Sequence, residues 1–176
     1  MSLTNDFFAA NSAEMAALDA RFGRWPEPPK KLAKKRWWSR GETEGAAPPE
    51  VDRPSLPIVE ARGILDVELA SLETLLEGRP IGDIDAVVSL IQDPIRQEPA
   101  DNPEAWISPL SPGLAAALTD VSDERISAVV PEWLATEEMA RSGWSNADAE
   151  GLLRGLRELV RRADQDGRHV YRWFAL

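Results

Sequence analysis

The chain has 176 residues, of which 43% are hydrophobic and 28% are charged, and it contains no cysteine. This length and balance are typical of one folded domain, and the absence of cysteine excludes disulfides, thiolate nucleophiles and cysteine-based metal sites. The formal net charge of -10 disfavours nucleic acid and anionic membranes as partners, because both repel an acidic protein.

The first part of the chain predicts a strand, a helix and then an irregular excursion. Residues 6–10 favour a strand, and the capping-box spacing of Asn11 and Glu14 predicts a helix over about 12–22. Half of the fourteen prolines fall within residues 25–57, where no hydrophobic period survives. We therefore expect a proline-rich irregular excursion over about residues 25–57.

The middle of the chain alternates extended and helical patterns. Residues 56–62 can extend, and Asp66 is expected to cap a helix that Gly78 ends. A second apolar stripe over 81–91 is followed by a polar loop at 92–104.

The pattern then predicts another strand and two helices. Residues 105–110 favour a short strand, after which Ser111 and Pro112 suit the N-cap and first position of a helix. Asp123 is expected to start the next helix, in which Pro131 predicts a kink or a restart.

The last third of the chain carries the clearest periodicity. A helix is predicted from Ser145 to Gly167, because apolar residues recur there at helical spacing. Residues 169–176 then alternate with bulky side chains on both sides, which indicates a largely covered strand. The predicted fold class is α+β, a small mixed or antiparallel sheet of three to four short strands covered by about five helices. We expect one domain over residues 1–176.

Five short motifs occur in a characteristic order along the chain. They are Asp6–Glu14, Leu75–Pro80, Leu110–Leu114, Thr136–Glu138 and Val170–Trp173. In this order they resemble a family of small actinobacterial proteins of unknown function, and the layout is more distantly similar to the YfbM-like family of bacterial α+β proteins. The resemblance implies a small sheet with helices packed on it and supplies no catalytic residue.

The residues that usually carry chemistry do not form a recognisable constellation. His169 is the only histidine, so neither a Ser-His-Asp triad with a recognisable partner nor a two-histidine metal site is predicted. The run from Asp164 to Gly167 is similar to part of a calcium loop but lacks the later ligands, and helix termination explains it. Glu137 and Glu138 point about 100° apart on a helix and are expected to face solvent. We therefore predict no catalytic residue, no metal site and no cofactor.

One segment has an unusual composition, because all four lysines lie within residues 30–35 and two tryptophans follow closely. Basic side chains beside aromatic rings are found in single-stranded nucleic-acid sites and in contacts with membrane surfaces. The candidate binding residues are Lys34, Lys35, Arg36, Trp37 and Trp38. The alternative is a loop that docks on the domain through both tryptophans, and the acidic remainder of the chain favours it.

Two functions from different classes stay open. The first is a non-enzymatic interaction or regulatory protein, with an immunity-type protein among the candidates, whose acidic surface meets a basic protein partner. The second is an enzyme with a site made of carboxylates and arginines. We favour the first, and a deep pocket with two or more converging carboxylates would favour the second. We expect a cytoplasmic protein without a membrane span, since no sufficiently long apolar run occurs.

Overall fold

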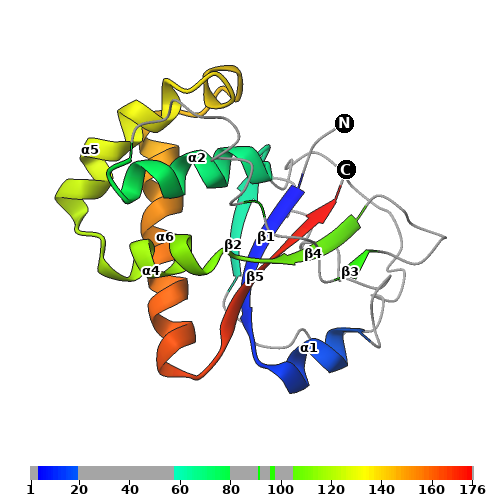
Figure 1. Cartoon of the computed structure of the whole chain (residues 1–176). Coiled ribbons are helices and arrows are strands. Elements are labelled where there is room, and N and C mark those ends of the chain that lie inside the picture. Colours follow the sequence, from blue (N-terminus) through cyan, green and yellow to red (C-terminus); the bar gives the residue numbers. More distant parts are fainter. Residues whose placement is uncertain (1–3, 20–57, 80–90, 92–95, 98–104, 176) are drawn as a thin grey trace, which may run out of the picture.

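The two central strands of the sheet come from opposite ends of the chain (Figure 1). The computed structural model describes residues 4–19, 58–79, 91, 96–97 and 105–175. β1 (Thr4–Ala10) pairs antiparallel with β5 (His169–Ala175), so that the two described ends of the chain lie side by side. β2 (Ile58–Arg62) pairs with the other side of β1, and β4 (Ala105–Pro109) with the other side of β5. The two-residue β3 (Arg96–Gln97) completes the order β2-β1-β5-β4-β3.

Four helices gather on one side of this antiparallel sheet (Figure 1). They are α2 (Asp66–Leu76), α4 (Pro112–Asp120), α5 (Asp123–Leu134) and α6 (Asn146–Gln165). The helix α1 (Ser12–Asp19) follows β1 and lies apart from them, and the short 3-10 helix η1 (Met139–Arg141) lies between α5 and α6. The predicted α+β class, with a small mixed or antiparallel sheet and about five helices, is confirmed; the sheet is antiparallel, and the two-residue β3 is a fifth strand beyond the predicted three to four.

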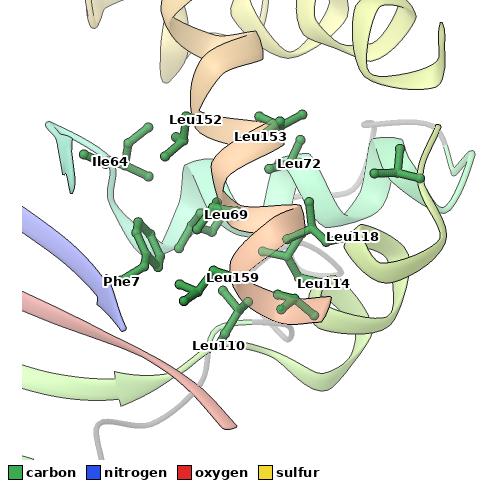
Figure 2. Packing of buried hydrophobic residues seen from close by; sticks show 14 of the residues in the cluster. Phe7, Ile64, Leu69, Leu72, Leu110, Leu114, Leu118, Leu152, Leu153 and Leu159 are labelled. Carbon is green, nitrogen blue, oxygen red and sulfur yellow. The ribbon is translucent and has the colours of Figure 1, made fainter. Parts of the chain in front are cut away.

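The main core fills the space between the helices and one face of the sheet. Figure 2 shows Phe7 of β1, Leu72 of α2, Leu114 of α4 and Leu153 of α6 converging there, and each is at most 1% exposed. Burying one such side chain contributes roughly 1.5–3 kcal/mol. Trp133 of α5 is also fully buried, and its indole Nε1 donates to the backbone oxygen of Glu68 over 2.9 Å. The apolar residues that recur at helical spacing in the sequence therefore form the inward face of each helix.

The opposite face of the sheet carries a smaller apolar cluster. Phe8, Ala10 and Ile107 are buried there, and Met15, Tyr171 and Trp173 pack against them. The rings of Phe8 and Tyr171 stack with centroids 5.8 Å apart. The prediction that bulky residues of the last strand point to both faces is therefore confirmed.

Most predicted helix boundaries are confirmed. Asn11 Oδ1 accepts from the backbone N–H of Glu14 over 2.9 Å, and Glu14 Oε2 accepts from Asn11 N–H over 2.8 Å, which is the predicted capping box. Ser111 Oγ accepts from Leu114 N–H over 3.0 Å at the start of α4. Gly78 and Gly167 have φ angles of 72° and 63°, the left-handed conformation that ends a helix.

Two predictions near helix ends need correction. The sequence predicts Asp66 as the cap of α2, but the N-cap is Leu65, whose N–H donates to Glu68 Oε2 over 2.8 Å, and Asp66 is the first helical residue. The carboxylate of Asp66 pairs with Arg172. At Pro131 the predicted restart does not occur, since α5 is one uninterrupted helix, and the alternative of a kink stays a prediction. The exposed Pro131 lies near the end of α5, so its missing N–H removes one late hydrogen bond and disturbs no buried packing.

Several predictions fall on residues that the structure does not describe. These are the helix beyond Asp19, the excursion at 25–57, the apolar stripe at 81–91 apart from Ile91, and most of the loop at 92–104. Within that predicted loop, Arg96–Gln97 instead form β3, because they pair with β4. Among the described helices, none has the length and apolar character needed to cross a membrane.

Candidate functional site

A cavity of about 20 Å³, which we call the α2 cavity, is lined by α2, β4, β5 and the segment that starts α4. Its polar lining is Asp66, Glu73, Ser108, Ser111 and Arg172, and its apolar lining is Leu69, Ala70, Ile91, Pro109, Leu110 and Leu114. The two carboxylates are seven positions apart on α2, which is about two helical turns, so both lie on the same face. The fold thus collects carboxylates and an arginine that are distant in sequence.

Arg172 is the central charged group of the α2 cavity. It is 1% exposed on the middle strand β5, its Nη2 donates to Asp66 Oδ1, and its guanidinium carbon lies 5.3 Å from the ring centroid of Phe174. Within the described part of the chain, its Nε and Nη1 have no hydrogen-bond partner. A buried donor left without an acceptor costs about 1–3 kcal/mol, and more when it is charged.

Glu73 is the second buried charge of the α2 cavity. Its carboxylate accepts a hydrogen bond from the Ser111 hydroxyl, and burial raises the pKa of Glu73. A Cβ added at Gly113 would lie only 2.0 Å from Glu73 Oε1, so a glycine at this position makes the close approach of Glu73 possible.

Glu73 and Ser111 can support few kinds of chemistry. A carboxylate with a raised pKa is suited to proton transfer, but the Ser111 hydroxyl is already engaged by Glu73 and by the backbone of Leu114. Small-molecule sites usually have volumes of roughly 300–1,000 Å³, whereas the α2 cavity has room for about one water molecule or one polar head group. As lined by the described residues, the cavity is smaller than the usual small-molecule site.

Mostly exposed carboxylates concentrate in residues 120–150, which we call the acidic segment. It carries eight carboxylates and two arginines. The carboxylates are Asp120, Asp123, Glu124, Glu132, Glu137, Glu138, Asp148 and Glu150. The helix α5, which is part of this segment, forms the side of the molecule farthest from the sheet (Figure 1). The segment therefore carries a strong excess of negative charge, and its α5 part lies away from the sheet.

Part of this charge is compensated within the protein. Asp123 contacts Arg157 over 3.0 Å and Arg154 over 3.4 Å, and its hydrogen bond with Arg157 is the main reason that the pKa of Asp123 is lowered. Glu137 and Glu150 form ion pairs with arginines one helical turn later. The side-chain carboxylates of Asp120, Glu132 and Glu138 make no hydrogen bond or ion pair within the described residues. These three carboxylates can meet a cation without breaking an existing pair.

A larger groove, of about 480 Å³, runs between α4, the end of α6 and the start of β5. Leu110, Ala115, Val160 and Ala163 supply much of its apolar wall, and His169 lies on its rim. His169 is an exposed strand-end residue, as predicted, and no hydrogen bond joins it to a carboxylate among the described residues. Sequence reasoning missed this groove, because its walls come from three separate segments that only the tertiary structure brings together.

The predicted binding residues Lys34, Lys35, Arg36, Trp37 and Trp38 lie outside the described residues, so their role stays a prediction. Sequence reasoning did not select Arg172, although a usable signal exists. In the alternating strand, Arg172 shares a side with Val170 and Phe174, both of which are buried. In the part of the chain that is described, no three carboxylates or histidines gather in a way that could hold a metal ion.

Comparison of the chain with protein-family models, with curated proteins and with solved structures finds no match. The resemblance to small actinobacterial and YfbM-like proteins therefore stays an expectation, and the function has to be inferred from the chemistry of the residues themselves.

Proposed function

We propose that this protein is a non-catalytic binding protein, of the regulatory or immunity type, that engages a basic protein partner through the acidic segment. The observation that carries this proposal is the excess of eight carboxylates over two arginines within residues 120–150. The side chains of three of those carboxylates, Asp120, Glu132 and Glu138, form no hydrogen bond or ion pair among the described residues.

The state of the charges that line the α2 cavity supports binding over catalysis. Asp66 is paired with Arg172, and Glu73 is held by the Ser111 hydroxyl that also caps α4. Both carboxylates thus contribute to the structure, and the cavity between them holds about one small group. An enzyme built on carboxylates and arginines would need a larger pocket beside such a pair.

The expected electrostatic contribution is mainly kinetic. Exposed charges on one surface accelerate the encounter with an oppositely charged partner, and salt weakens this effect because it shortens the range of the interaction. Each exposed charge pair is worth roughly 0–1 kcal/mol. Several unpaired carboxylates acting together are therefore needed for a measurable effect on association.

The test compares two variants that lose the same charge at different places. One is Asp120→Asn/Glu132→Gln/Glu138→Gln, within the acidic segment. The matched control is Glu60→Gln/Glu158→Gln/Asp164→Asn, which changes three exposed carboxylates outside that segment. The probe is a fluorescein-labelled peptide of lysine and alanine, and its association rate is measured by stopped-flow anisotropy from about 0.05 to 0.5 M NaCl.

We expect the wild-type association rate to fall steeply as salt rises, and the acidic-segment variant to associate about three to ten times more slowly than the control at low salt. Equal rates for the two variants would show that only net charge matters. That result would contradict a localised interaction surface.

A further inference from the structure

The groove of about 480 Å³ between α4, the end of α6 and the start of β5, which we call the α4–α6 groove, has the volume of a small-molecule site. Such sites usually measure roughly 300–1,000 Å³ and are mostly apolar. The buried part of the lining is entirely apolar and consists of Leu110, Val160, Ala163 and Val170. Other lining residues, such as Ala116, are exposed, so a ligand can reach the groove from solvent.

Short side chains on α4 keep the groove open. Pro112, Ala115, Ala116 and Thr119 line it from α4, and their spacing of three, four and seven positions places them on one side of the helix. An alanine side chain ends at Cβ, so Ala115 and Ala116 leave space that a longer side chain would occupy. The groove is therefore a consequence of the residue types on this side of α4.

The charged residues of the lining give the groove a negative character. Arg168 is part of the lining, but its guanidinium already donates to Glu14 over 2.8 and 3.1 Å and to Asp166 over 3.0 Å. Two carboxylates thus compensate one positive charge. Asp164 also lines the groove and is exposed, and its carboxylate makes no hydrogen bond or ion pair within the described residues. The α4–α6 groove therefore combines an apolar surface with one uncompensated carboxylate.

We propose that the α4–α6 groove binds a hydrophobic amine, with its ammonium group at Asp164 and its hydrocarbon part on the apolar lining. The ammonium is attracted by Asp164 and by the surplus of carboxylate around Arg168, whereas an anionic ligand would be repelled by both. The hydrocarbon supplies most of the affinity, because a single exposed ion pair contributes little. The groove shares no lining residue with the acidic segment, so this proposal and the proposed function can fail separately.

The experiment uses three probes with the same seven-carbon skeleton and different charges: cyclohexylmethylammonium, cyclohexylmethanol and cyclohexanecarboxylate. A fourth probe, methylammonium, carries the charge without the ring. Each is titrated at about pH 7 and about 0.05 M NaCl into the full chain with 13C-labelled alanine methyl groups. The methyl resonance of Ala163 is followed by NMR. Ala149 is the internal reference, because it is also buried on α6 but does not line the groove.

We expect cyclohexylmethylammonium to shift the Ala163 resonance saturably with a Kd of about 1–10 mM, as is usual for so small a ligand. The alcohol should bind about three to five times more weakly, because it lacks the attraction to Asp164. The carboxylate and methylammonium should bind at least about tenfold more weakly, the first because of repulsion and the second because it lacks the ring. The Ala149 resonance should not shift saturably with any probe.

Two pairs of variants locate the ligand, and all four positions are exposed, so the variants are expected to fold. Asp164→Asn should weaken cyclohexylmethylammonium about three- to fivefold. Its control is Glu158→Gln, which removes a carboxylate from the same helix outside the groove and should change the Kd less than about twofold. Ala116→Leu fills the groove and should weaken binding at least about fivefold. Ala128→Leu adds the same side chain on α5, outside the groove, and should bind like the wild type.

Four results would overturn the proposal. If cyclohexylmethylammonium does not shift the Ala163 resonance saturably, the groove is not an amine site. If the alcohol or the carboxylate binds as tightly as the ammonium, charge does not select the ligand. If Asp164→Asn binds the ammonium like Glu158→Gln, Asp164 does not hold the amine. If Ala116→Leu binds it like Ala128→Leu, the probe occupies another place.

Discussion

Replacing Gly113 by alanine should reveal how firmly the buried Glu73 is held. The new Cβ would lie 2.0 Å from Glu73 Oε1 and 3.0 Å from its carboxyl carbon, so the side chain has to move. Moving it breaks the hydrogen bond from the Ser111 hydroxyl, and a buried hydrogen bond to a charged group is worth roughly 1.5–3 kcal/mol. Against this, alanine is favoured over glycine in a helix by up to about 1 kcal/mol. We expect Gly113→Ala to destabilise the protein by about 1–2 kcal/mol.

A double-mutant cycle separates these two effects. In the background of Glu73→Ala the clash is absent, so adding Gly113→Ala should stabilise the protein by about 0.5–1 kcal/mol. The coupling between the two sites is then about 1.5–3 kcal/mol. Urea denaturation followed by circular dichroism gives the four free energies of unfolding. If Gly113→Ala has the same effect in both backgrounds, the packing of Glu73 against Gly113 does not constrain the fold.

Three further predictions address pH, the sheet edge and the last strand. Since burial raises the pKa of Glu73, the folded state holds this proton more tightly than the unfolded state. Stability is therefore lost as pH rises from about 4.5 through the raised pKa. Between pH 4 and 8, the melting temperature of Glu73→Gln should fall less than that of the wild type. Trp144 Nε1 donates to the backbone oxygen of Arg62 on edge strand β2 over 3.0 Å. Trp144→Phe should therefore lower the free energy of unfolding by about 0.5–1.5 kcal/mol, and light scattering should detect concentration-dependent association through the exposed edge; an unchanged mass at high concentration would argue against a protective role. Deleting Tyr171–Leu176 removes most of a central strand and should abolish the cooperative melting transition, whereas a transition within a few degrees of the full chain would contradict its central place.

Local sequence signals determined most of the secondary structure. The capping box of Asn11 and Glu14, the N-cap Ser111 and the terminating Gly167 act over three or four residues, so their physics is contained in short stretches of sequence. The same holds for α6, whose buried leucines recur at helical spacing. The alternating pattern of the last strand also predicted its burial, because large apolar residues occupy both of its faces.

The tertiary structure decided what the charged residues do. Asp66 suits an N-cap by its local sequence, but its carboxylate instead forms a partly buried ion pair with Arg172, 106 positions later. Ser111 and Glu73 meet across 38 positions. Such pairs depend on β5 joining between β1 and β4 and on α2 packing against α4 and α5, and the favourable free energy comes from burying surfaces that are far apart in the chain. Local propensity carries no information about which distant partner a charge will meet, so the secondary structure was predictable from sequence and the α2 cavity was not.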